Sequence, residues 1–194
     1  MTATGQPPRH AGTSAADAVR VRDARDDERD ALGALTLRAY AEYVSVMAPA
    51  AWETLERAVR AALASEDQVE RIVAERGGAL VGGVHLFPPA TDAFTGYAAP
   101  PRWPELRLLA VAPEARGLGV GRALVEECVR RARRMGALEL GLHTSRSMRI
   151  AMGMYERMGF VRAPEHDFQP EGAELVQAYL LPLDGAREGS VDPG

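Results

Sequence analysis

The sequence predicts an α/β fold: a mixed, mostly antiparallel central sheet with one parallel crossover and helices on both faces. One observation is a hairpin signal, in which two strand-like runs at 68–75 and 79–87 are joined by a short turn with two glycines. The other is an apolar strand at 105–111 that leads through a glycine turn and an amphipathic helix into a strand at 138–144. Because a strand–helix–strand unit returns in the same direction, this segment supplies the parallel crossover.

Local patterns predict the remaining elements in order: a strand from Val19, a helix from Asp26 or Asp27 to about Val46, helices at 50–65 and 148–159, and antiparallel strands at 160–164 and 175–183. No internal repeat interrupts this order, so we expect one domain from residue 19 to 183. The segments 1–18 and 184–194 have few apolar residues and are expected to be tails.

The length, charge and residue composition of the chain limit the kinds of protein it can be. The chain has 194 residues, 46% of them hydrophobic and 26% charged, and a formal net charge of -4, which suits one globular domain and disfavours a general nucleic-acid binder. No run is long and apolar enough for a membrane helix, and the N-terminal segment lacks the apolar core of a signal peptide. With its single cysteine, Cys128, the chain is expected to be cytoplasmic. The absence of a Cys/His or acidic cluster predicts no metal.

Three glycines, Gly117, Gly119 and Gly121, stand between the strand at 105–111 and the next helix. Such a turn is an anion site, because the free N–H groups at the helix start and the helix dipole favour negative charge. The phosphate loop G-x-x-x-x-G-K-[ST] and the dinucleotide fingerprint G-x-G-x-x-G both fail from Gly117, since Arg122 stands where each needs a glycine. The fingerprint also fails from Gly119, because Leu124 stands at its last position. The alternative is that the glycines only allow close packing.

The turn does meet the pattern R-x-x-G-x-G through Arg116, Gly119 and Gly121, and the segment "MYERMGF" follows downstream. In these motifs the chain resembles the GNAT superfamily of acyl-CoA-dependent N-acetyltransferases. The resemblance implies a GNAT-like fold, a single N-acetyltransferase domain at 19–183, and acetyl-CoA as the acyl donor with no metal. It also implies that the turn holds the pyrophosphate and the preceding strand holds the pantetheine arm, which assigns to the cofactor Leu109, Val111, Arg116, Gly117, Leu118, Gly119, Val120, Gly121, Arg122 and Ser147.

The implied reaction makes three chemical demands. An amine attacks the thioester and the CoA thiolate leaves, so the site needs a base for the amine, an N–H donor for the oxyanion and an acid for the thiolate. Glu105, at the start of its strand, is the candidate base, and a structural salt bridge is the alternative. Tyr155 of "MYERMGF" matches the family tyrosine near the cofactor sulfur and is the candidate acid. The alternative is a tyrosine that is only packed.

One position departs from the family pattern. Many relatives carry asparagine seven residues before the tyrosine, and this chain carries Met148 there. A polar contact to the cofactor is therefore missing or is replaced by Ser145 or Ser147. This departure leaves room for a second function, a non-catalytic acyl-CoA-binding or sensor module, beside the N-acetyltransferase.

The acceptor is expected to be a small-molecule or peptide amine, with no nucleic acid and no membrane as partner, and a homodimer is compatible with this function. His85 and His143 lie in predicted strands and are interpreted as hydrogen-bonded structural histidines, although they could also meet near the acceptor. The predicted walls of the acceptor site are aromatic: Tyr40, Tyr43 and Phe87, with Phe94, Tyr97 and Trp103 from a long loop.

Overall fold

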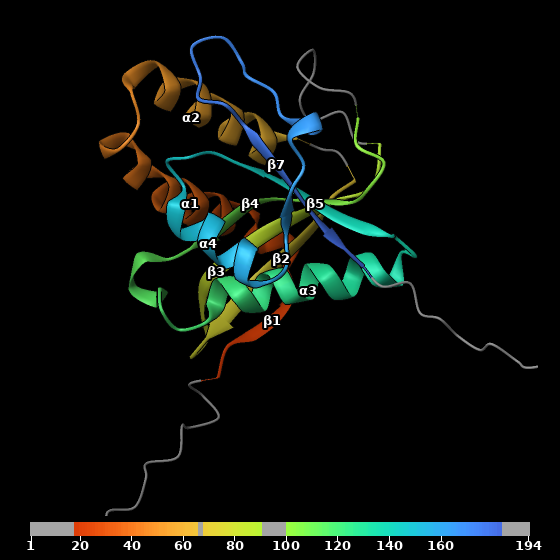
Figure 1. The fold of residues 1–194 in the computed structure, drawn as a ribbon. Coiled ribbons are helices and arrows are strands. Elements are labelled where there is room, and N and C mark those ends of the chain that lie inside the picture. The colour runs from red at the N-terminus through yellow and green to blue at the C-terminus, as the bar shows by residue number, and fades with distance from the viewer. Residues whose placement is uncertain (1–17, 66–67, 91–99, 184–194) are drawn as a thin grey trace, which may run out of the picture.

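A computed structural model describes residues 18–65, 68–90 and 100–183. Seven strands form one sheet in the order β1-β2-β3-β4-β5-β7-β6 (Figure 1). The strands are β1 (Arg20–Asp23), β2 (Glu70–Arg76), β3 (Ala79–Phe87), β4 (Glu105–Val111), β5 (Glu139–Thr144), β6 (Val161–Arg162) and β7 (Gln177–Pro182). The α-helices are α1 (Arg29–Tyr40), α2 (Pro49–Ala64), α3 (Val120–Arg134) and α4 (Arg149–Arg157). Outside the described residues lie the predicted tails, apart from Ala18, and the loop residues Phe94 and Tyr97.

All neighbouring strands in this sheet pair antiparallel except β4 and β5, which are parallel. Helix α3 connects that pair and therefore forms the crossover. The predicted fold class, mixed and mostly antiparallel with one parallel crossover, is confirmed. No helix within the described ranges has the length and apolar character that crossing a membrane requires.

Two adjacent glycines on β3 show how helices cover both faces of the sheet. A Cβ on Gly82 would lie 2.8 Å from Val120 of α3 and 2.9 Å from the carbonyl oxygen of Ala110. A Cβ on Gly83 would lie 2.3 Å from Leu32 of α1. Because successive residues of a strand point to opposite faces, α3 packs on one face and α1 on the other. The absence of a side chain at these two positions lets both helices approach the strand closely.

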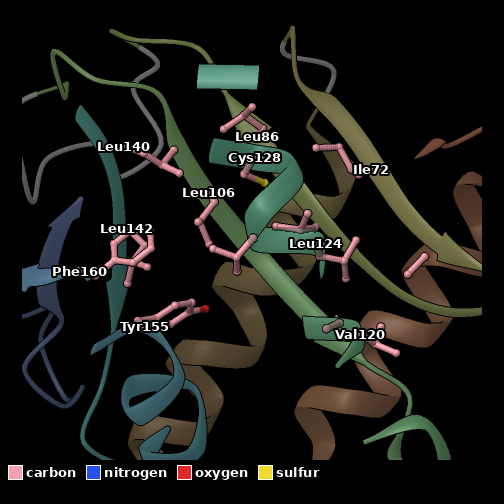
Figure 2. Packing of buried hydrophobic residues seen from close by; sticks show 14 of the residues in the cluster. Ile72, Leu86, Leu106, Val120, Leu124, Cys128, Leu140, Leu142, Tyr155 and Phe160 are labelled. Carbon is pink, nitrogen blue, oxygen red and sulfur yellow. The ribbon is translucent and has the colours of Figure 1, made fainter. Parts of the chain in front are cut away.

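The main hydrophobic core lies between the sheet and α3 (Figure 2). Leu86 of β3, Leu106 of β4 and Leu124 of α3 are almost completely buried there. Cys128 belongs to the same core, and burial raises the pKa of its thiol to about 12. The cysteine is thus an inert packing residue on the buried side of α3.

The first helix is shorter than predicted. It ends at Tyr40 and continues as a 3-10 helix, η3 (Ala41–Ser45), instead of running as an α-helix to about Val46. Val44 and Val46 are exposed and Tyr43 and Met47 are only half-buried, so this stretch buries little apolar surface. The chain therefore tightens into a 3-10 turn and restarts at Pro49, which suits the first turn of α2 because it needs no N–H partner there.

A β-bulge interrupts β4 in its middle. Gly83 of β3 pairs with Ala110 and His85 pairs with Arg107, so a single β3 residue faces two residues of β4. One of the two, Leu108, has a left-handed φ of +53°, which is unusual for leucine. The bulge redirects the backbone of the strand that precedes the glycine turn.

The parallel pairing between β4 and β5 is short. It comprises only Glu105 with Gly141 and Leu106 with Leu142. Beyond Leu106 the two strands are no longer paired with each other, which leaves a split in the sheet. This split leads toward the glycine turn at the end of β4, and the candidate site lies around it.

Candidate active site

The glycine turn between β4 and α3 has a backbone that most residues do not tolerate. Gly117 and Gly119 have φ angles of +75° and +78°, in the left-handed region that favours glycine. Gly119 caps α3, and its carbonyl accepts a hydrogen bond of 3.0 Å from the N–H of Ala123. The N–H groups just before Ala123 have no partner within the helix, so they are suited to bind an anion.

Both arginines predicted at the turn are paired with glutamates. Arg116 forms an ion pair with Glu42, which lies after α1, and Arg122 Nε donates to Glu126 Oε1 at 2.7 Å. The four side chains are exposed, so these pairs contribute little stability and can open at small cost. The backbone of the turn is therefore its main anion-binding element, with two cations beside it.

The split between β4 and β5 begins where their pairing stops. Leu109 and Val111, the predicted partners of the pantetheine arm, lie on β4 beyond Leu106, the last residue paired with β5. A strand edge without a neighbouring strand offers N–H and C=O groups to an extended ligand that contains amides. The position of these residues fits their expected role.

Two buried hydroxyl groups lie at the end of β5, on the other side of the split. Thr144 Oγ1 and Ser145 Oγ have no hydrogen-bond partner among the described residues. By contrast, Ser147 Oγ donates to Glu174 Oε1 at 2.6 Å, so the hydroxyl of this predicted cofactor contact is already engaged. Because buried hydroxyls normally have partners, Ser145 and Thr144 fit a ligand that brings amide or hydroxyl groups into the split.

Tyr155 of α4 is almost completely buried, with its ring 5.6 Å from that of Phe160. Figure 2 shows its hydroxyl oxygen directed away from Phe160, toward β4. Burial raises the pKa of Tyr155 well above its ordinary value, and the hydroxyls of Tyr40 and Tyr43 raise it further. The phenol therefore stays protonated near neutral pH and can act as a hydrogen-bond donor.

Tyr40 and Tyr43 form an edge-to-face aromatic pair, with ring centroids 5.8 Å apart. Burial raises the pKa of both hydroxyls. Two of the six aromatics predicted for the acceptor site, Tyr40 and Tyr43, therefore act electrostatically on the candidate acid, Tyr155.

Glu105 is completely buried at the start of β4. Its carboxylate accepts hydrogen bonds from Arg107 Nη2 at 2.9 Å and pairs with His143 Nδ1 at 2.8 Å. Burial raises the pKa of the carboxyl, but the hydrogen bond to His143 and the charge of Arg107 outweigh it and hold the pKa below its usual value. The candidate base is thus an ionised group inside a buried network, without direct access to solvent.

Both ring nitrogens of His143 lie at hydrogen-bond distance from oxygen atoms. His143 Nε2 lies 3.2 Å from the carbonyl oxygen of His166, and Nδ1 lies 2.8 Å from Glu105 Oε1. The histidine therefore holds the Glu105 carboxylate from β5 and links the two strands at the point where they separate.

Phe87 and Trp103, two further predicted aromatic walls, surround Glu105. Phe87 is the cross-strand neighbour of Glu105, and the guanidinium of Arg107 lies 4.6 Å above its ring. Trp103 packs on the bare backbone of Gly141, where a Cβ would lie 2.0 Å from its indole nitrogen. These aromatics cover the buried carboxylate on the face of the sheet that carries α1.

Sequence reasoning missed the partners of Glu105. Arg107 follows at the next position on the same face of β4, a spacing that the alternation of a strand could have indicated. His143 was interpreted as a hydrogen-bonded structural histidine, and it does have hydrogen-bond partners. His85 does not meet it, because β4 lies between their strands, and both ring nitrogens of His85 lack a partner among the described residues.

Comparisons with known proteins agree with this architecture. A mycothiol acetyltransferase from Geodermatophilus obscurus is 38% identical over 58 residues, which are 30% of this chain and only 19% of that protein. An N-acetyltransferase structure from Rhodopseudomonas palustris has a TM-score of 0.63 at 18% identity and covers 90% of this chain and 99% of its own. The PaiA N-acetyltransferase from Thermoplasma acidophilum, in complex with coenzyme A, has a TM-score of 0.58 at 16% identity, covering 83% of this chain and 98% of its own.

The two solved structures establish the fold alone, because their sequence identity is low. A family model described as the acetyltransferase (GNAT) family matches residues 37–160, more than half of the chain. This match includes α2, the split sheet, the glycine turn and Tyr155. The chain belongs to the acetyltransferase (GNAT) family.

Proposed function

We propose that the protein transfers an acetyl group from acetyl-CoA to a primary amine by direct attack within a ternary complex. The observation that carries this proposal is the alignment of the glycine turn with the split between β4 and β5. Around the split the chain offers N–H groups for a pyrophosphate, a strand edge at Leu109 and Val111 that β5 does not pair with, and the buried hydroxyls of Thr144 and Ser145. Acetyl-CoA presents an anion, amides and a thioester in a matching order.

Tyr155 is proposed as the acid that protonates the departing thiolate. Its raised pKa supports the role, because a phenol that stays protonated can donate as negative charge develops on sulfur. The neighbouring hydroxyls of Tyr40 and Tyr43 favour a polar environment around an otherwise apolar ring. These two residues are proposed to line the approach of the acceptor.

Glu105 is proposed as the base that receives the proton of the attacking amine. Since its carboxylate is completely buried and both ring nitrogens of His143 are engaged, the proton has to arrive through water that enters the split beside Glu105. An amine with a pKa of about 10.4 is mostly protonated at neutral pH, so a path for this proton is a requirement of the reaction. Arg107 holds the carboxylate in place and is a positioning residue.

The burial of Glu105 also favours a second candidate function, an acyl-CoA-binding module without catalysis. In such a module the enclosed network of Arg107, Glu105 and His143 would have a structural role alone, to join β4 to β5. In that case the turn and the split would still bind acetyl-CoA, but no amine would be acetylated.

An assay of CoA release distinguishes the two functions. The protein is incubated with acetyl-CoA and a panel of small amines, peptides and aminoglycosides, and binding of acetyl-CoA is measured separately by calorimetry. Binding together with amine-dependent release of CoA is the expected result. Binding without release for any amine of the panel would favour the module, and a lack of binding would overturn both.

A further inference from the structure

A cavity of about 510 Å³ lies between α1, α2 and the strands β2 and β3, away from the glycine turn. Helix α1 and helix α2 form its walls, and Arg71 of β2 and His85 of β3 form its floor. Its volume is within the range of small-molecule sites. We call it the arginine pocket; its lining residues are Arg29, Asp30, Leu32, Gly33, Ala34, Leu37, Arg60, Leu63, Ala64, Arg71 and His85.

The charges that line the arginine pocket are unbalanced, since three arginines face one aspartate. Arg60 is paired with Glu56 on its own helix. Arg29 and Arg71 both donate to the same neutral group, the backbone carbonyl of Ser65, at 3.2 and 3.1 Å. Two guanidinium groups thus converge without a carboxylate between them in the described part of the chain. Burial and, to a smaller extent, the charge of Arg29 lower the pKa of Arg71.

The floor of the pocket contains buried polar atoms that have no partner among the described residues. They are Nε of Arg71 and both ring nitrogens of His85, whose side chain is only 2% exposed. Burial and the nearby charges of Arg71 and Arg29 lower the pKa of His85 to about 4, so the ring is neutral at physiological pH. It then offers one N–H donor and one acceptor. Unsatisfied buried groups are costly, so a ligand that satisfies them is favoured.

The remaining walls are apolar, with leucines at positions 32, 37 and 63. A cavity lined both by cationic donors and by aliphatic side chains is complementary to an organic acid rather than to inorganic phosphate. We propose that the arginine pocket binds the carboxylate of an organic acid, with Arg29, Arg71 and His85 contacting its oxygens and the leucines contacting its apolar body.

The pocket is connected to the candidate active site through the sheet. Arg71, His85 and Arg107 are successive cross-strand neighbours on β2, β3 and β4, and Arg107 donates to Glu105. Neighbouring strands are about 4.8 Å apart, so an acid above His85 lies on the order of 10 Å from β5, where His143 stands. Either the acceptor amine carries this acid at its far end, or a separate acid binds beside the active site as an effector.

Binding of hexanoate, with hexanamide as the uncharged control, tests the proposal without any need for catalysis. Calorimetry should show that hexanoate binds and hexanamide does not, and the NMR signals of the His85 ring nitrogens should shift on titration with hexanoate.

Arg71→Met should weaken hexanoate binding by about tenfold to a hundredfold, since a charge-assisted contact is lost. Arg29→Met gives a second variant in case Arg71→Met does not fold, and Arg20→Met on exposed β1 is the matched control. Absence of hexanoate binding, or binding that is equally strong in both pocket variants, overturns the proposal.

A second measurement separates the two sources of the acid and rests on the proposed function. Acetylation of 6-aminohexanoate is compared with that of 6-aminohexanamide, and hexanoate is added to reactions with an uncharged amine. A preference for 6-aminohexanoate that disappears in Arg71→Met identifies the acid as part of the acceptor. A change in the rate with the uncharged amine identifies an effector. If no amine is acetylated at all, the proposed function fails, while hexanoate binding still decides the pocket.

Discussion

Glu105 Oε1 lies 2.8 Å from Nδ1 of His143. His143 directly follows Leu142, the last residue of β5 that pairs with β4. The contact therefore spans the two strands at the base of the split. His143 Nε2 lies 3.2 Å from the carbonyl oxygen of His166, so the ring is held on both sides. Arg107 and His143 both contact the buried carboxylate of Glu105, so its charge is not left unpaired in the interior.

Glu105→Gln should lower turnover while it preserves the affinity for acetyl-CoA. The amide keeps the shape of the side chain but cannot accept a proton, and general-base help is typically worth about 10²–10⁴-fold. The loss should be largest at low pH, where more of the amine is protonated. The pH dependence of kcat, measured beside acetyl-CoA binding and a thermal melt, checks this. A profile with the height and shape of the parent's would exclude Glu105 as the base.

Glu28→Gln should destabilise the fold in a pH-dependent way. Two hydrogen bonds from Arg22, at 2.7 and 2.8 Å, lower the pKa of Glu28 from 4.5 to about 2. Because the folded-state pKa is depressed, the stabilisation is complete above about pH 4.5 and is lost as the pH falls toward 2. Removal of the charged partner should cost about 1–3 kcal/mol of unfolding free energy at pH 7.

Urea unfolding of Glu28→Gln and its parent at pH 7 and near pH 2.5 gives the required comparison. The difference between the two proteins should shrink strongly at the lower pH. Glu126→Gln is the matched control, since its ion pair with Arg122 is exposed and should change stability by less than about 1 kcal/mol. An equal difference at both pH values would mean that Glu28 contributes through packing and not through its charge.

Gly119→Val should abolish most of the acetyl-CoA binding. A β-branched side chain is strained at a φ of +78°, and it would project from the turn whose N–H groups are expected to face the pyrophosphate. Gly136→Val is a matched control at the other end of α3, with a φ of +72° and equally open surroundings. Both variants should lose similar stability, and calorimetry should find that only Gly119→Val loses affinity. Equal affinities in the two folded variants would remove the glycine turn from the cofactor site.

The extent of β4 and the glycine turn could be predicted because their signals are local. An apolar run bounded by Pro104 and Pro113 has little freedom to begin or end elsewhere, and β4 occupies 105–111 as expected. The left-handed Leu108 could not be predicted, since leucine has no preference for that conformation and the bulge arises from pairing with β3. The end of α1 differs from the prediction for a related reason: the helical spacing of apolar residues continues past Tyr40, but Val44 and Val46 stay exposed.

The contact between Glu105 and His143 could not be predicted from the sequence, because it depends on the register between β4 and β5. The two residues are 38 positions apart, and a shift of one residue in β5 would turn His143 to the opposite face. The arginine pocket has the same origin, since Arg71 and His85 become neighbours only through the hairpin register. Local sequence patterns predict where helices and strands lie, whereas contacts between side chains on neighbouring strands also depend on the register of those strands.

Tyr155→Phe should lower kcat more than it changes the KM for acetyl-CoA. The substitution removes one hydroxyl and little volume, so a fold that only packs the ring should tolerate it. If the hydroxyl donates to the departing thiolate, its contribution arises as charge develops in the transition state, and a loss of kcat of about 10²–10⁴-fold is expected.

Tyr179→Phe is the matched control. The ring of Tyr179 is also buried, but its hydroxyl donates to Glu156 at 3.3 Å and has no proposed role in the reaction. An acyl donor with a more acidic thiol should reduce the loss in Tyr155→Phe, because such a thiolate leaves without assistance. A lower melting temperature with unchanged kcat, as expected for Tyr179→Phe, would show that Tyr155 is only a packing residue and would favour the acyl-CoA-binding module.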